Sequence, residues 1–356
     1  MAATVPNLDR NPLSGRKRQK SQRIFSLAAC LAAASLILPA GAPVQAQQKL
    51  PWSGYVQTRF LHQNRSANTG FSIRRAKIWW KGKTPFADSW SYKVQAIFRQ
   101  KNAGSLVLQD AYAEYQSSIF IIKFGQMVPN FSLQRSQPDY RIPVIERAQA
   151  IDHLIPSAET GARDIGLQLS LSPGWHSLHI SIGAFNGNGG NQLKNEDRNF
   201  LVTHRTTARF YVSPRTQLQV GYSLAYRKTT GLPFKKIFAD NRVFAGEDFR
   251  SGIEFRLYHP RWGLQAEYIR ARLGHRISWG SYVLVNYKFL PKHELVFSVD
   301  KFHDLSAKTA DRPWFILGYN FYPRKNKAKL MLDSRAQFTQ TRTNYQLAIQ
   351  LQLMFN

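Results

Sequence analysis

The chain has 356 residues, of which 49 are Lys or Arg and 21 are Asp or Glu, so its formal net charge is +28. A hydrophobic fraction of 43% argues against intrinsic disorder, and a single cysteine excludes a disulfide scaffold. The longest apolar run, Ile24 to Leu38, is too short for a transmembrane helix. What remains is a globular protein or a β-barrel whose charge suits an anionic partner, such as nucleic acid, lipopolysaccharide or a small anion.

Residues 1–46 have the pattern of a secretory signal peptide. Five basic residues from Arg16 to Arg23 precede the apolar run, and Val44-Gln45-Ala46 offers small residues for cleavage. A lipoprotein-type box ending at Cys30 is the alternative, but the apolar run continues past it. Removing the segment leaves residues 47–356, with 43 basic and 20 acidic residues, a net charge of +23 and no cysteine. We expect those residues to form one domain that uses no thiolate metal site.

Apolar residues occupy alternate positions through most of the remaining chain, most clearly from Tyr345 to Phe355. A period of two indicates β-strands and does not fit helices. Segments of about ten residues match tilted transmembrane strands, whereas strands of soluble β-sandwiches are usually about five to six residues long. Sixteen such segments begin near Ser53, Phe71, Trp90, Leu106, Phe120, Arg163, Trp175, Asn199, Gln217, Phe249, Trp262, Ser278, His293, Pro313, Lys329 and Asn344.

The connections between these segments alternate between tight turns and long loops, as they do in outer-membrane barrels. Tight turns are expected at Ser213–Arg215, His259–Arg261, Leu290–Lys292 and Tyr322–Arg324, among others, and long loops at Gly187–Arg198, Arg227–Asp248 and His303–Arg312. The pattern predicts an all-β fold, a 16-stranded antiparallel transmembrane β-barrel, with a margin of two strands. Aromatic residues near the tight turns, including Trp79, Trp80, Trp90, Tyr211, Tyr287 and Tyr322, are interpreted as a girdle at the membrane interface.

The longest stretch without strand character runs from residue 127 to residue 162, after the fifth strand. Its apolar residues, such as Phe131 and Ile151, need a surface to pack on, and the inner wall of the barrel is available. We therefore expect a third loop that folds inward and brings Arg135, Arg141 and Arg147 to a constriction. The alternative is that Asp139, Glu146 and Asp152 pair with these arginines and stabilise the loop itself.

Basic residues also fall on the polar side of the strand alternation. In a barrel this side faces the lumen, where rings of Arg and Lys favour anions over cations. A competing interpretation places much of the positive charge at the outer rim, against lipopolysaccharide phosphates. The expected lumenal basic residues are Arg59, Lys93, Arg99, Arg205, Arg209 and Arg256.

From Gly54 to Leu169 the chain resembles the phosphate-selective porin O and P family. The resemblance rests on an ordered set of local patterns, among them Phe71-Ser72-Ile73-Arg74-Arg75-Ala76-Lys77, Leu108-Gln109-Asp110-Ala111-Tyr112, Phe124-Gly125-Gln126, Pro129-Asn130-Phe131-Ser132 and Ile145-Glu146-Arg147. The family implies a trimeric outer-membrane pore with 16 strands and an inward third loop. It also implies that Arg74, Arg75 and Asp110 lie at the constriction, where guanidinium groups donate hydrogen bonds to phosphate oxygens.

Two details refine the resemblance. Arg74 and Arg75 are adjacent, so a regular strand would point them to opposite faces, and both reach the pore only across a β-bulge or if one is buried against the third loop. The stretch Met127-Val128-Pro129 lacks the basic residue that family members often carry there. We therefore expect a general anion preference, with phosphate or polyphosphate as the best guess among anions.

Other functions fit less well. The nine histidines are scattered, and the chain has no Gly-x-Ser-x-Gly or His-Glu-x-x-His motif, so an outer-membrane enzyme acting on lipid is a weak alternative. The basic residues do not cluster as a nucleic-acid-binding motif, and export separates the chain from nucleic acid. The sequence predicts no metal and no cofactor. A general porin of low selectivity remains the main alternative.

Overall fold

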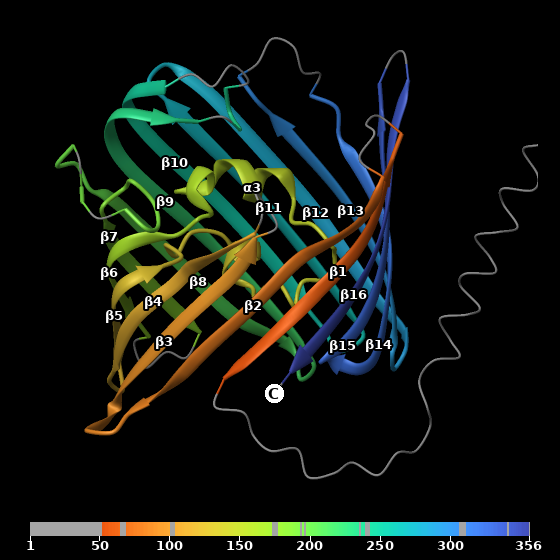
Figure 1. Cartoon of the computed structure of the whole chain (residues 1–356), viewed down its shortest axis with the longest axis horizontal. Coiled ribbons are helices and arrows are strands. Elements are labelled where there is room, and N and C mark those ends of the chain that lie inside the picture. The colour runs from red at the N-terminus through yellow and green to blue at the C-terminus, as the bar shows by residue number, and fades with distance from the viewer. Residues whose placement is uncertain are drawn as a thin grey trace, which may run out of the picture. The chain divides into compact units, whose positions relative to one another are not determined.

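The computed structural model describes residues 52–64, 69–99, 104–172, 177–192, 194–195, 197–234, 236–238, 243–305, 311–339 and 342–355. The predicted signal segment and Trp175 lie outside these residues. Within the described residues, sixteen antiparallel strands form a closed barrel in which each strand pairs with its neighbours in sequence and β1 pairs with β16 (Figure 1). The fold class predicted from the alternation is therefore confirmed.

Most strands begin within three residues of the positions expected from the sequence. The bounds are β1 Ser53–Gln63, β2 Gly70–Thr84, β3 Ala87–Arg99, β4 Ser105–Gln116, β5 Phe120–Met127, β6 Asp164–Leu171, β7 Leu178–Phe185, β8 Leu201–Ser213, β9 Thr216–Pro233, β10 Val243–Tyr258, β11 Trp262–Leu273, β12 Arg276–Leu290, β13 His293–His303, β14 Trp314–Asn326, β15 Ala328–Phe338 and β16 Thr343–Phe355. Three short helical pieces, α2 Leu133–Ser136, α3 Gln149–Leu154 and the 3-10 helix η1 Ala158–Thr160, lie between β5 and β6.

Two expected connections are wrong. The chain does not turn at Tyr322–Arg324, because β14 continues to Asn326 and the turn is at Lys327. Pro323 lies where the pairing of β14 with β15 shifts register, a place where a strand tolerates a residue without an N–H donor. The segment Arg227–Asp248 is also not one long loop, because β9 and β10 extend into it and pair Arg227 with Asp248.

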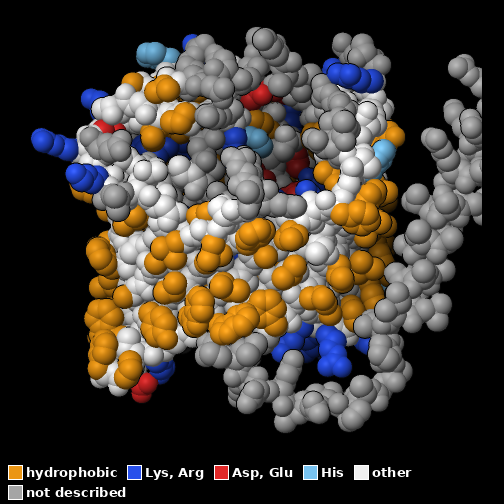
Figure 2. Space-filling view, viewed as in Figure 1, with side chains coloured by type: hydrophobic (Ala, Val, Ile, Leu, Met, Phe, Trp, Pro, Cys, Tyr) orange, Lys and Arg blue, Asp and Glu red, His pale blue; other side chains and the backbone are white. Residues whose placement is uncertain are grey.

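The two faces of the wall differ as the alternation requires. Large apolar side chains such as Leu317 and Leu353 are more than half exposed on the outer face, and Figure 2 shows apolar side chains gathered over that wall. Polar side chains such as Gln57 and Gln352 are almost fully buried on the inner face, where their amides hydrogen-bond at 2.8 Å. Apolar residues outside and polar residues inside are the arrangement of a barrel in lipid. Among the described residues, no helix is long and apolar enough to cross a membrane.

The aromatic girdle needs a correction. Trp80, Trp90, Tyr211 and Tyr287 are exposed large side chains, as a girdle requires. Trp79 is the neighbour of Trp80 in the alternation and so faces the other way, where its ring stacks on Tyr140. The Tyr322 hydroxyl donates to the carboxylate of Glu294 at 2.5 Å. Trp79 and Tyr322 therefore belong to the inner side.

The segment from residue 128 to residue 163 packs against inner-face residues of many strands. Phe131, Ile151 and Leu154 are at most 2% exposed and share one apolar core with residues of β11, β12 and β13, the strands on which α3 lies (Figure 1). Hydrogen bonds hold the segment near its start and at its middle. Its backbone N–H groups donate to the carboxylates of Glu267 and Asp333, and its carbonyls accept from Asn320 and Lys329.

Candidate pore constriction and anion site

Two carboxylates of this segment, Asp139 and Glu146, meet five cations; we call these seven residues the latch cluster. Glu146 accepts from Arg59 at 2.6 Å and from two nitrogens of Arg74 at 2.5 Å. Arg75 lies between the two acids, 3.6 Å from Glu146 and 3.8 Å from Asp139. Asp139 also accepts from Lys77 at 2.5 Å and from Arg147 at 2.8 Å. The latch cluster therefore ties the segment to β1 and β2, and its five basic residues outnumber its two carboxylates.

A β-bulge lets both neighbouring arginines reach the latch cluster. Gln57 of β1 pairs with Arg75, and the next residue, Thr58, pairs with Ile73, so Arg74 is the extra residue of β2. After the bulge, Arg75 and Lys77 share the inner face, while Arg74 turns its guanidinium to Glu146. A bulge re-aims a side chain at the cost of one ladder position. A bulge was one of the two ways that the sequence offered for both arginines to reach the pore; the other, burial of one arginine against the loop, describes Arg75, which is 8% exposed.

Both loop carboxylates are ionised at neutral pH. Burial raises the pKa of the Glu146 carboxyl, but the hydrogen bonds and charge of Arg74, together with the charge of Arg75, outweigh burial and lower that pKa to about 2. Burial acts in the same direction on Asp139, yet the charges of Lys77, Arg75 and Arg147 hold its pKa well below the ordinary range. The two carboxylates of the latch cluster are therefore charged at neutral pH.

Asp110 forms a second, smaller group. Its carboxylate accepts from Lys93 at 2.6 Å and from Arg163 at 3.1 Å. Lys93 comes from β3, Asp110 from β4, and Arg163 directly precedes β6. The Asp-Ala-Tyr aspartate thus orients two cations, one on the wall and one at the end of the segment.

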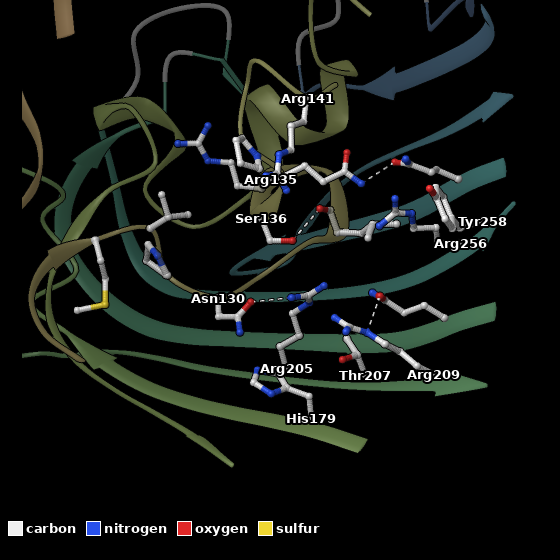
Figure 3. Close-up of a pocket in the computed structure, with 18 of the residues that line it drawn as sticks. Asn130, Arg135, Ser136, Arg141, His179, Arg205, Thr207, Arg209, Arg256 and Tyr258 are labelled. Atoms are coloured by element: carbon white, nitrogen blue, oxygen red, sulfur yellow. Dashed lines mark hydrogen bonds between the residues drawn. The ribbon is translucent and has the colours of Figure 1, made fainter. Parts of the chain in front are cut away.

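A cavity of about 680 Å³ lies between the segment and the strands from β3 to β12. Figure 3 shows Arg135 and Arg141 on the segment and Arg205, Arg209 and Arg256 on the strands around it. Its acidic lining residue, among those that the structure describes, is Asp110. Its basic lining residues are Lys93, Lys123, Arg135, Arg141, Arg205, Arg209 and Arg256.

Four inner-face residues form a row across neighbouring strands in this cavity; we call them the anion wall. Arg209 of β8 pairs with Gln219 of β9, which pairs with Arg256 of β10, which pairs with Gln265 of β11. Arg209 donates to the Gln219 amide oxygen at 3.2 Å, and Arg256 lies over the ring of Tyr258. Neither arginine has an ion pair with any described residue, so their charge is available to a solute.

The other predicted basic residues differ in whether a carboxylate pairs with them. Arg205 is paired with Glu254 at 2.8 Å, and Arg147 is buried among Gln134, Gln137 and Asp139 of its own segment. Arg141 is exposed over the Tyr140 ring, without an ion pair to a described residue. The side chain of Arg99 lies outside the described residues.

Arg135 lines the cavity from the segment. It donates to the carbonyls of Gly161 and Ala162 at 3.1 and 3.5 Å. Burial and the nearby charges of Arg163 and Arg147 lower its pKa to about 9, so it is still protonated at neutral pH. Four of the predicted arginines therefore present charge to the cavity and have no ion pair with a carboxylate of the described residues. They are Arg135, Arg141, Arg209 and Arg256.

Sequence reasoning passed over several functional side chains. Lys77 carries the same inward alternation as Arg75, so its position was recoverable from the bulge. Lys123 pairs with Glu114 on the neighbouring strand at 3.1 Å, which the strand alternation also permits. Asp333 and Lys329 bind the segment from distant positions, and Arg163 at the end of the segment pairs with Asp110 of β4. No local pattern marks any of the three.

Solved structures share the fold. OmpF of Salmonella typhi, in complex with daunomycin, matches with a TM-score of 0.60 and 15% identity over 85% of this chain and 97% of that chain. A loop-deletion mutant of OmpT, an outer membrane protein of Vibrio cholerae, matches with a TM-score of 0.58 and 12% identity over 85% and 98%. The outer membrane channel DcaP of Acinetobacter baumannii matches with a TM-score of 0.53 and 14% identity over 89% and 100%.

At these identities the structures establish the fold alone. No curated protein sequence matches the chain. The family model described as phosphate-selective porin O and P matches residues 44–356, nearly the whole chain. That coverage, on a closed barrel with an apolar outer face, shows that the chain is an integral outer-membrane porin and belongs to the phosphate-selective porin O and P family.

Proposed function

We propose that this porin lets small anions diffuse passively across the outer membrane, through a lumen narrowed by the segment from residue 128 to residue 163. Phosphate and polyphosphate are the solutes we favour. We also propose that the protein has no enzymatic activity and assembles as a homotrimer. A solved structure of Vibrio cholerae OmpT is described as a trimer form. The family name supports the choice of phosphate.

The observation that carries the proposal is the anion wall. Arg209 and Arg256 face a cavity with Arg135 and Arg141 on its other side, and no ion pair with a described residue neutralises any of the four. Fixed cations in a narrow lumen set up a positive potential that draws in anions and repels cations. Guanidinium groups also donate paired hydrogen bonds to oxyanions, which chloride cannot use as well.

The contacts of the segment with the barrel wall support a narrowed lumen. Its hydrogen bonds reach β11 through Glu267, β14 through Asn320 and β15 through Asp333, while the latch cluster reaches β1 and β2. These strands lie along one half of the closed barrel, with β2 and β11 at its two edges, and we infer that a segment bound at both edges extends into the space that the barrel encloses. A solute that passes the cavity then passes beside Arg135 and Arg141.

The test is the zero-current potential of single channels in a KCl gradient. The double variant Arg209→Gln, Arg256→Gln should lower the chloride-to-potassium permeability ratio by about fivefold for each charge, because one unit charge contributes on the order of 1 kcal/mol in a wet pore. Arg215→Gln, in the exposed turn between β8 and β9, is the control and should leave the ratio unchanged.

Two results would overturn the proposal: cation preference in the native channel, or an unchanged ratio in the double variant. Adding phosphate to the KCl solution separates the solutes. A phosphate-preferring pore loses chloride current at phosphate concentrations far below that of chloride, and the double variant relieves this block. A general porin of low selectivity shows neither block nor relief.

A further inference from the structure

A second basic group lies on the outside of the barrel, away from the pore. Arg270 and Arg272 of β11 alternate with the buried Ile269, Ala271 and Leu273, so they point outward, and both are exposed. Lys301 of β13 alternates in the same way with the buried Asp300. All three lie within a few residues of the loop ends of their strands. We call these three residues the outer basic patch.

Strand register brings the patch together around one tryptophan. Arg270 pairs with Trp279 of β12, which pairs with His303 of β13, and one row below, Ser281 pairs with Lys301. Lys301 Nζ lies 5.1 Å from the centre of the Trp279 ring. Tyr268 and His303 stack on either side of that ring, with centroids 6.1 and 6.0 Å away. Arg272 lies over the ring of Phe249 at 5.7 Å.

None of the three cations of the patch has an ion pair with a described residue. Two acids lie near it: Asp311, which pairs with His303, and Glu247, which is in register with Lys228. The contacts of the patch are aromatic faces, which attract cations but leave their N–H donors free. Its positive charge is therefore open to a ligand that approaches from the membrane side.

Below the patch the outer wall becomes entirely apolar. The next row across β9 to β14 consists of Val220, Phe255, Ala266, Val283, Val299 and Phe315. Val283 is 47% exposed, and Phe297 and Leu317 in the following row are 49% and 62% exposed. Cations and aromatic rings above a broad apolar surface match the headgroup and the acyl chains of a lipid.

A nearby part of the wall, on β15 and β16, differs. Near their loop ends these strands turn outward Ala336, Phe338, Tyr345 and Leu347, all uncharged, and Ala336 is in register with Tyr345. These two strands contrast with β11 and β13, which carry the three cations of the patch near their loop ends.

We propose that the outer basic patch binds a phosphorylated lipid of the outer leaflet, the lipid A portion of lipopolysaccharide. Arg270, Arg272 and Lys301 would bind its phosphates, the aromatic rings would contact its sugar headgroup, and its acyl chains would lie along the apolar rows. A second copy of this chain suits the patch less well. The outward acids that the described strands offer are Glu247, beside Lys228, and Asp88, next to the turn at the far end of β3.

The experiment measures binding of fluorescent diphosphoryl lipid A to the intact protein in a neutral detergent. The triple variant Arg270→Gln, Arg272→Gln, Lys301→Gln should weaken binding by about tenfold or more, since each cation near an anionic lipid surface contributes appreciably. The control removes three exposed cations from the tight turns, Arg215→Gln, Arg261→Gln and Lys292→Gln, with the same change in net charge. It should bind like the native protein.

The ligand and the alternatives are separated in the same assay. Lipid A without its phosphates should bind the native protein as weakly as diphosphoryl lipid A binds the patch variant, and millimolar inorganic phosphate should not displace the lipid. Equal binding by the patch variant and the control variant would overturn the proposal. Loss of oligomers in the patch variant with unchanged lipid binding would identify the patch as a contact between copies instead. Channel selectivity, measured in parallel, should be unaffected.

Discussion

Arginines gather on two sides of the lumen, and the two sides treat them differently. In the latch cluster, Arg59, Arg74 and Arg75 meet the carboxylate of Glu146. In the anion wall, Arg209 and Arg256 alternate with glutamines and meet no described carboxylate. Both places use arginine, so the presence or absence of a carboxylate partner decides what each arginine does. A paired arginine holds the segment, and an unpaired one presents its charge to the solute.

This difference changes the meaning of the family's arginine pair. The resemblance places Arg74 and Arg75 at the constriction as contacts for phosphate. The structure shows Arg74 in two hydrogen bonds with Glu146 and Arg75 nearly buried between Glu146 and Asp139. We therefore propose that the pair first positions the segment. The excess charge of the latch cluster then adds to a selectivity that depends mainly on the anion wall.

The largest expected effect comes from removing the carboxylate of the latch. Glu146→Gln leaves Arg59, Arg74 and Arg75 without their shared partner, and an unpaired buried charge costs about 3 kcal/mol or more. The segment should open on the order of a hundred times more often, measured as faster cleavage by trypsin and as noisier single-channel current. The matched control is Asp152→Asn in α3, which removes a loop carboxylate that has no ion pair among the described residues. Equal cleavage of both variants would contradict the latch.

The strands could be predicted from the sequence because a period of two is readable over ten residues. The bulge was one of two ways to bring the adjacent Arg74 and Arg75 to the pore, the other being burial of one of them against the loop. The errors also have local causes. Pro323 marks a register shift inside β14 rather than a turn, and the pairing of Arg227 with Asp248 extends a hairpin through a stretch without apolar alternation.

The partners of the site could not be predicted. Arg74 and Glu146 are 72 residues apart, and Ile145 and Asp333, which share a hydrogen bond, are 188 apart. Closing the barrel brings such residues together, and the alternation of each strand is compatible with many partners. The sequence could therefore name Arg74, Arg141 and Arg256 alike as candidates. It could not say that Arg74 pairs with a carboxylate and that Arg141 and Arg256 pair with none among the described residues.

Two single variants test whether the latch cluster holds the segment while the anion wall sets the ion selectivity. Arg75→Gln should loosen the segment by about 2 kcal/mol, because it removes a buried charge that lies 3.6 Å from Glu146 and 3.8 Å from Asp139, and should change selectivity little. Arg256→Gln should do the reverse, lowering the chloride-to-potassium permeability ratio about fivefold without affecting trypsin cleavage. Both properties are measured on both variants. If either variant changed the stability of the segment and the ion selectivity to a similar degree, the division of roles between the latch cluster and the anion wall would be wrong.

Acid should release the latch within a defined range of pH. The pKa of Glu146 is lowered from its ordinary value of 4.5 to about 2, so its contribution is complete above pH 4.5 and is lost as the pH falls toward 2. Current noise should stay constant between pH 8 and pH 5 and rise below pH 4.5. The Glu146→Gln channel should be noisy throughout and lack this dependence on Glu146. A native channel whose noise rises already near pH 6 would point to another titrating group.

The smallest effect is expected at Arg141, which presents its charge from an exposed position over Tyr140. Salt screens such a charge, since the Debye length is about 10 Å at 0.1 M and about 3 Å at 1 M. Arg141→Gln should lower the permeability ratio by roughly twofold in dilute KCl and leave it unchanged in 1 M KCl, whereas Arg256→Gln should retain most of its effect at high salt. Arg141→Lys, which keeps the charge, is the control. If Arg141→Gln matched or exceeded Arg256→Gln at both salt concentrations, selectivity would depend on the segment, and the anion wall would be secondary.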